Sequence, residues 1–484
     1  MMSRMMSRMM SRMMSRGMRR RSFRVLSLLA ALLAATVLVA EARAAETPRA
    51  ASSATVRAQL PNGLKVIIVP TSRLPLVDFR LVARAGSVND PAGREGVAEL
   101  TAELLTQGAG KRTAKQLADD IEFVGGSLSA SAGAEQLVVS CEVLKKDVGV
   151  GLELFHDVIV SPAFSAEEFA RKKEAALGQI ASDKSEPSVI AENAMTRWFW
   201  GDSPLGHPAI GWETSLKAAT RDDVVKFHHD YVAPERSVLV VVGDVSATAF
   251  LASLRSAFAG WKQSGAAPAG DPYGPAAAIH GRTVRIVNKP EATQAQIRMM
   301  CPSVPRNHPD WYALQVANTI CGAGFTSRLV NSIRVEQGLT YSIGSGFRQD
   351  RAAGAFRIST FTRNEQLRKC VDAVLAEVKK LVDSGPTDAE LDKSHNYLKG
   401  QFPLGLQSPD ELAGEIANVE FFGLPEDFIA SYPDKIGAVN MADVKRVLKT
   451  YFCTDDLKIL VVTNGELARK ALDGVGTLEM KEIE

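Results

Sequence analysis

Two glutamates four residues apart are the first candidates for chemistry in this chain. Glu99 and Glu103 lie in an apolar, helix-like stretch, and a spacing of four places both carboxylates on one helix face. Two carboxylates without an imidazole bind a hard cation weakly and zinc poorly. We therefore predict a solvated or hydrogen-bonded pair of glutamates here, and no metal.

A guanidinium and a phenol seven residues apart form the second candidate. Arg334 and Tyr341 both carry hydrogen-bond donors, and preorganised donors of this kind stabilise a developing oxyanion. The residue types alone leave a second interpretation equally open, in which Arg334 caps the C-terminus of a helix and Tyr341 packs in a strand.

Neither the histidines nor the cysteines form a recognisable metal site. His228 and His229 are adjacent and point in different directions on a helix, and four further histidines are isolated, as surface or core histidines usually are. The isolated histidines are His156, His280, His308 and His395. The five cysteines show no C-x-x-C spacing: Cys141, Cys301, Cys321, Cys370 and Cys453. This sparse set predicts at most two disulfides, favours buried thiols, and excludes structural zinc on cysteine.

The first 44 residues have the composition of a secretory signal. An arginine-rich start leads into an apolar run over residues 25–40, shorter than the about 20 residues that cross a bilayer. Ala42-Arg43-Ala44 fits a cleavage site. We expect export, to the periplasm, with no stable membrane insertion after signal removal; a retained membrane anchor is the alternative.

Removal of the signal reverses the sign of the net charge. Residues 1–44 hold nine arginines and one acid, so 57 basic and 55 acidic side chains become 48 and 54, and the charge changes from +2 to −6. An acidic mature chain gives no support to nucleic-acid binding.

The chain repeats itself at an offset of about 221 residues. A buried strand followed by a turn is expected at 237–245 and 458–465, and each is preceded by an amphipathic helix, at 222–231 and 443–451. Helix starts with a capping residue followed by acids occur at Ser165 and Thr387. Three pairs at nearly one offset predict a tandem of two similar domains.

The composition divides the chain into four parts. We place the signal at 1–44, a first domain at 55–264, an exposed linker rich in Gly, Pro and Ala at 265–278, and a second domain at 279–484. Strands are expected at 64–69, 77–85, 136–143, 283–287, 296–301 and 355–360. Because helices follow these runs without a regular βαβ alternation, we predict an α+β fold, with each domain a mostly antiparallel sheet packed with helices.

Several short segments, in this order, resemble the insulinase/pitrilysin/mitochondrial processing peptidase family. They begin with Leu60-Pro-Asn-Gly-Leu-Lys-Val-Ile and continue with Ala85-Gly-Ser-Val-Asn-Asp, Gly96-Val-Ala, Gly125-Gly126 and His207-Pro208. The resemblance runs from about residue 57 to the C-terminus. It implies that each such chain forms half of a clamshell.

The family's inverted zinc motif, H-x-x-E-H, is missing. In active members two imidazoles on adjacent helical turns bind zinc, the glutamate between them takes a proton from the bound water, and a distant glutamate is the third ligand. At the matching positions this chain has Glu99, Ala102 and Glu103, and Gln179 stands at the position of the distant ligand. All four chemical positions are replaced, so no cofactor is expected on this chain.

Other elements of the family are retained. Arg334 and Tyr341 match an arginine/tyrosine segment that, in active relatives, holds the substrate backbone at the zinc site. Gly322 and Gly324 resemble a glycine-rich substrate-recognition loop, although a plain turn is equally open. The run Ser127-Leu-Ser129-Ala-Ser131 matches the edge strand on which an extended peptide is laid, and an ordinary edge strand is the alternative.

These expectations lead to three hypotheses. The first is a zinc-less subunit that pairs with a zinc-bearing homologue, encloses peptide substrates, and supplies Arg334 and Tyr341 in trans. The second is a scaffold or peptide-binding protein without turnover. The third is a metallopeptidase in its own right.

Overall fold

The computed structural model describes residues 55–265 and 270–482, and these residues belong to one compact unit. The expected signal at 1–44 and part of the expected linker lie outside the described residues. No helix within the described ranges is long and apolar enough to cross a membrane.

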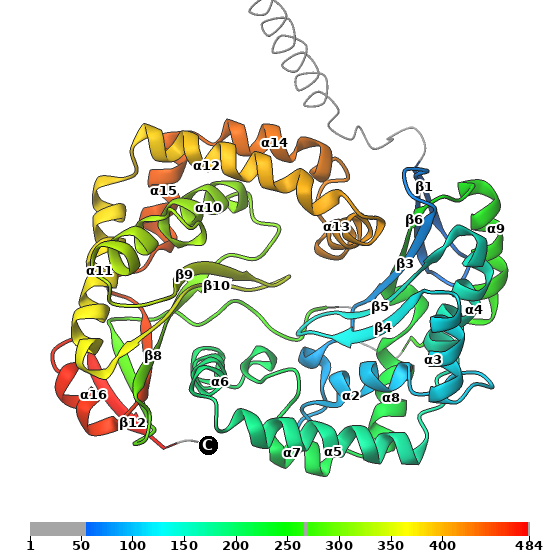
Figure 1. Cartoon of the computed structure of the whole chain (residues 1–484), viewed down its shortest axis with the longest axis horizontal. Helices are drawn as coiled ribbons and strands as arrows, with labels where there is room; N and C mark the ends of the chain where they lie inside the picture. The colour runs from blue at the N-terminus through cyan, green and yellow to red at the C-terminus, as the bar shows by residue number, and fades with distance from the viewer. Residues whose placement is uncertain (1–54, 266–269, 483–484) are drawn as a thin grey trace, which may run out of the picture. The chain divides into compact units, whose positions relative to one another are not determined.

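The first half of the chain is built around a six-stranded sheet. Its strands are β1 (Val56–Gln59), β2 (Lys65–Pro70), β3 (Leu76–Ala83), β4 (Ser127–Ala132), β5 (Leu137–Leu144) and β6 (Ser237–Gly243), in the spatial order β1-β2-β6-β3-β5-β4. Its helices are α2 (Val97–Leu105), α3 (Ala114–Phe123), α4 (Val148–Val160), α5 (Ala166–Asp183), α6 (Pro187–Trp200), α7 (Glu213–Ala218), α8 (Arg221–Tyr231) and α9 (Ala247–Ala257). Figure 1 shows α3, α4 and α9 on one side of this sheet.

The second half repeats this plan. Its strands are β7 (Thr283–Asn288), β8 (Gln294–Ser303), β9 (Ile343–Gln349), β10 (Gly354–Arg363), β11 (Lys458–Thr463) and β12 (Thr477–Lys481), in the order β12-β7-β11-β8-β10-β9. Its helices are α10 (Trp311–Asn318), α11 (Leu367–Ser384), α12 (Asp388–Gln401), α13 (Pro409–Phe422), α14 (Phe428–Ala438), α15 (Met441–Tyr451) and α16 (Gly465–Ala471).

The predicted fold class and internal repeat are confirmed. Five strands of each sheet correspond, because β2-β6-β3-β5-β4 matches β7-β11-β8-β10-β9 in sequence order and in space. Four of the five strand pairs are antiparallel in the first sheet and three of the five in the second. All six expected strand runs are strands, and Ser165 and Thr387 both cap helices, accepting backbone hydrogen bonds from Glu168 and Glu390. The sheets differ at β1, which is antiparallel to β2, whereas β12 is parallel to β7.

Each sheet buries two apolar faces, and one helix crosses from each half to cover the other half's second face. The first sheet packs one face on its own helices, while α13 contacts β3 and β6 on the other, where Ala413 and Ala417 meet the β6 valines. In the second sheet α6 takes the equivalent place against β8 and β11, with Ala191 buried there. The bounds of α6 and α13 differ by 222 residues at both ends, so the exchanged helices are themselves repeat equivalents.

A disulfide between Cys301 and Cys453 joins β8 to the chain just after α15, across 152 residues of sequence. The remaining cysteines, Cys141, Cys321 and Cys370, are buried free thiols. Burial raises the pKa of Cys141 and of Cys321 to about 12, so neither forms a thiolate near neutral pH. One bridge and three buried thiols lie within the limit expected from the sequence.

Because α6 and α13 each cover the sheet of the other half, we predict that a charge at a sheet-facing position of either helix destabilises the protein. Ala191→Asp on α6 and Ala417→Asp on α13 each place a carboxylate in a dry apolar contact, at an expected loss of about 3 kcal/mol or more in the free energy of unfolding. Thermal unfolding followed by circular dichroism measures the loss. The same change at the exposed Ala181 of α5 is the control, and equal melting temperatures for all three variants would contradict the exchange.

The disulfide gives a second prediction. Peptide mapping without reductant should link the peptides that contain Cys301 and Cys453, with the other three thiols alkylated only after unfolding. The double variant Cys301→Ser/Cys453→Ser should be less stable by up to about 4 kcal/mol, because the bridge closes a long loop in the unfolded chain. Alkylation of native Cys301 in air, or a different pairing, would exclude this bridge.

Candidate functional site

The helix that the resemblance matches to the family's zinc helix is α2, and a partly buried aspartate fixes where it begins. Asp90 accepts hydrogen bonds from the backbone N–H groups of Gly96 and Ala98, both at 2.7 Å. Gly96, at φ 107°, takes the left-handed conformation that precedes the first turn. Burial raises the pKa of Asp90 to about 8.

Three of the four residues that the resemblance matches to metal positions have partners within the protein. Glu99 accepts a hydrogen bond of 3.2 Å from the backbone N–H of Ala132, and burial raises the pKa of Glu99. Glu103 forms an ion pair of 3.6 Å with Lys172 of α5. Gln179, exposed on the same helix, donates a hydrogen bond of 2.7 Å to Asp183.

This arrangement does not fit zinc. Ala102 is fully buried and offers no base. The Lys172 ammonium lies beside the glutamates, so it would repel a metal cation placed there. Within residues 55–265 and 270–482 there is no cluster of three or more His, Cys, Asp or Glu side chains that could hold a metal ion. These positions therefore supply no water-activating chemistry.

Arg334 and Tyr341 lie side by side. Arg334 is on a π-helical segment, Val330–Glu336, and Tyr341 follows a turn at Gly338, where φ is 59°. The guanidinium carbon is 5.0 Å from the centre of the tyrosine ring. Tyr341 is 77% exposed, between buried Thr340 and the start of β9.

The donors of this pair are not used internally. Apart from the contact with each other, neither Arg334 nor Tyr341 has a side-chain hydrogen bond or ion pair to any described residue. Arg334 does not bind the carbonyls at its helix end, and Tyr341 is not packed in a strand. The structure thus brings together two side chains that the sequence singled out, with their hydrogen-bonding groups open to solvent.

The glycine-rich segment is helical where the sequence analysis placed a loop. Residues Thr319–Ala323 continue α10 as a π-helical turn. A Cβ at Gly322 would lie 2.4 Å from Ser345 Oγ and 2.7 Å from the Ser345 nitrogen, so glycine is required there for packing against β9. Gly324 follows the turn, where a Cβ would make an ordinary contact of 3.6 Å with the Thr319 carbonyl oxygen, and next to it Phe325 is exposed.

The serines expected on an edge strand do lie on one. β4 is the last strand of the first sheet and pairs only with β5 among the described residues. Ser127, Ser129 and Ser131 alternate with partly buried residues, so all three hydroxyls are exposed on the same face.

Sequence reasoning missed a group of charged residues beside these serines. Asp78 and Arg80 of β3, Glu142 of β5 and Asp410 of α13 line a cavity of about 520 Å³ together with Ser127 and Ser129. The signal for two of them was present, because in the run 77–81 the side chains alternate and Asp78 and Arg80 fall on the face opposite the core.

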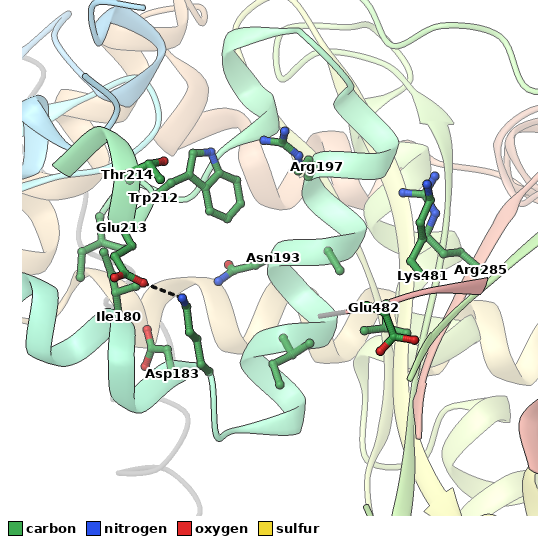
Figure 2. Close-up of a pocket in the computed structure, with 16 residues that line it drawn as sticks. Ile180, Asp183, Asn193, Arg197, Trp212, Glu213, Thr214, Arg285, Lys481 and Glu482 are labelled. Atoms are coloured by element: carbon green, nitrogen blue, oxygen red, sulfur yellow. Dashed lines mark hydrogen bonds and ion pairs between the residues drawn. The ribbon is translucent and has the colours of Figure 1, made fainter. Parts of the chain in front are cut away.

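A second cavity, of about 470 Å³, lies between α5, α6, the segment before α7 and the strands β7 and β12 (Figure 2). Ile180, Ile190 and Val287 give it apolar walls. Two of the charged groups in its lining are paired within the protein: Lys184 with Glu213 at 2.6 Å, and Arg285 with Glu479 at 2.8 Å. Its lining includes no histidine or cysteine, so it offers no nucleophile or general base of those types.

Comparisons with known proteins agree with this picture. A profile of the family described as insulinase (peptidase family M16) matches residues 65–212, and one described as the peptidase M16 inactive domain matches residues 218–398. An uncharacterized zinc protease of Streptomyces coelicolor is 26% identical over 400 residues, covering 81% of this chain and 86% of its own. One of Mycobacterium leprae is 28% identical over 382 residues, covering 78% and 84%.

Solved structures share the fold. A peptidase M16 inactive domain from Pseudomonas fluorescens superposes with a TM-score of 0.78 at 26% identity, over 85% of this chain and 98% of that one. A protease from Helicobacter pylori gives a TM-score of 0.78 at 21% identity, over 84% and 99%. The chain therefore belongs to the insulinase/pitrilysin peptidase family, as a member that lacks the family's zinc motif.

Proposed function

We propose that this chain is the zinc-less subunit of an exported peptidase pair, and that it supplies Arg334 and Tyr341 in trans to the zinc site of a homologous partner. The observation that carries the proposal is the contact between these two side chains, whose donors have no partner among the described residues. The Arg334 guanidinium carbon is 5.0 Å from the centre of the Tyr341 ring, and side chains this close can donate hydrogen bonds to one oxyanion.

The proposal divides the chemistry between two chains. The partner's H-x-x-E-H helix holds the metal and activates the water, while this chain orients the peptide and stabilises the charge that develops on its carbonyl oxygen. The edge of β4 that faces away from β5 offers backbone groups on which an extended peptide can be laid, apart from the Ala132 N–H that donates to Glu99. Peptides thus contact this chain at β4 and at the Arg334/Tyr341 pair.

Export to the periplasm is part of the proposal. Its support is the composition of residues 1–44 and the disulfide between Cys301 and Cys453, a bond that persists in oxidising compartments.

Replacement of the donor pair tests the role in trans. With a co-purified homologue that carries H-x-x-E-H, Arg334→Ala and Tyr341→Phe should each lower kcat by about 10²-fold or more, since each removes a transition-state donor. The zinc content of the partner and the affinity of the complex should stay unchanged. Arg469→Ala, at an exposed arginine on α16, and Tyr397→Phe on α12 are matched controls. A stable complex whose activity is unaffected by both site variants would favour a scaffold role.

Metal analysis tests the division of labour. The isolated chain, desalted after purification, should retain less than 0.1 zinc per chain (on the order of background), because α2 presents carboxylate, methyl and carboxylate. It should also fail to hydrolyse peptides alone. One tightly held zinc per chain that disappears in Glu99→Ala would show instead that this chain is a metallopeptidase.

A further inference from the structure

The cavity beside β4 combines three carboxylates with one guanidinium. Its charged residues, Asp78, Arg80, Glu142 and Asp410, together with the serines that line it, are called the carboxylate pocket below. It lies on the sheet face that α13 covers, where the apolar contact between α13 and β6 ends.

Strand register explains how these residues meet. Asp78 pairs with Glu142 across β3 and β5, and Glu142 pairs with Ser127 across β5 and β4. Directly paired residues in an antiparallel sheet point to the same face, so the three side chains form a row that leads from the sheet's interior to its free edge. The neighbouring row is Arg80, Ser140 and Ser129.

The charges in the pocket are only partly compensated. Arg80 forms an ion pair with Asp410 of α13, and its Nε remains buried without a partner. Asp78 is 1% exposed, and neither of its carboxylate oxygens has a hydrogen-bond partner. Glu142 has no hydrogen bond or ion pair to a described residue.

An isolated buried carboxylate is costly, and proteins normally pair it or protonate it. Burial, together with the negative charges of Asp410 and Glu142, raises the pKa of Asp78 to about 7 despite the nearby Arg80. The pKa of Glu142 is also raised, by burial and by Asp410. A cation bound here would lower the pKa values of Asp78 and Glu142 toward the usual range of carboxyl groups.

The geometry favours an organic cation over a metal ion. The described residues include no group of three metal ligands, and the Arg80 guanidinium lies among the carboxylates. A peptide strand added outside β4 would be two strand spacings, about 10 Å, from β5. The serines on β4 are small, so a long side chain on the added strand can pass over them and meet Glu142, with Asp78 behind it.

We propose that the carboxylate pocket binds the lysine or arginine side chain of a peptide laid along β4. The proposal rests on the peptide-binding part of the proposed function and adds a preference to it. An ammonium or guanidinium group would donate to Glu142 and offset the unpaired charge of Asp78. Alternate residues of an added strand point to this face, so one position of the peptide, and not its neighbours, should show the preference.

Binding of matched peptides to the full chain tests the preference directly. The probes are a fluorescein-labelled decapeptide of alanine and threonine with one central lysine, and the same peptide with norleucine in place of lysine. Fluorescence anisotropy at pH 8 should give a dissociation constant about ten-fold lower for the lysine peptide, as expected for one charge-assisted contact. This comparison uses the wild-type protein and needs no variant to fold.

Substitutions in the carboxylate pocket test whether the preference for the lysine peptide arises there. Glu142→Gln and Asp78→Asn should each reduce the preference for lysine to about three-fold or less, with binding of the norleucine peptide unchanged. Glu142→Lys should reverse it, so that a glutamate peptide binds better than the lysine peptide. Glu122→Gln, at an exposed position of α3 outside the pocket, removes the same charge and should leave the ten-fold preference intact.

Two outcomes would overturn the proposal, and they differ in whether they also exclude peptide binding at β4. Equal affinity for lysine and norleucine peptides excludes the pocket but leaves β4 as a peptide-binding edge. Failure of both peptides to bind excludes the pocket and the peptide-binding role of β4 together. The role of Arg334 and Tyr341 in trans is judged by the activity of the pair, so it does not depend on either outcome.

Discussion

The constraint on which the rest of the structure depends is that each sheet has two apolar faces and only one set of helices from its own half to cover them. The β6 strand is buried along its whole length and presents valines to both sides. Leaving one such face in water would cost about 25 cal/mol for each Å² of apolar surface. The exchange of α6 and α13 meets this requirement in both halves at once. It also places Asp410, from the second half, beside Asp78 and Arg80 of the first.

The region where the resemblance predicts a zinc site is a packed part of the fold. The helices α2 and α5 remain in contact, with the Glu103–Lys172 ion pair between them. An ammonium can neutralise carboxylates and link two helices, but it has no open coordination position for a water and cannot lower the pKa of one. Fold and function are separable here, because the helices where the resemblance predicts a zinc site carry groups that do not fit the metal.

Local patterns predicted much of this structure, and long-range pairings account for what they missed. The repeat offset, the six strand runs and the capped starts of α5 and α12 all follow from residues close in sequence. The destination of α6 and α13 does not, because an amphipathic helix carries no signal that specifies which sheet it covers. The same holds for the Arg80–Asp410 pair, 330 residues apart, and for the choice of Cys301 and Cys453 among five cysteines. Gly322 was misassigned to a loop because its requirement, close contact with Ser345, is tertiary.

Hydrogen-bond satisfaction distinguishes the two kinds of candidate residue in this protein. At the former metal positions Glu99, Glu103 and Gln179 all have partners within the chain, as expected of side chains that serve only the fold. Asp78 is buried with both carboxylate oxygens unpaired, and the Arg334/Tyr341 donors face solvent. An unpaired buried charge lowers stability, and a neutral side chain of similar size would avoid that cost. Among the candidate residues, those that remain unsatisfied in the isolated chain are therefore the ones whose partners should be sought on another molecule, and these lie beside a strand edge and on an exposed turn.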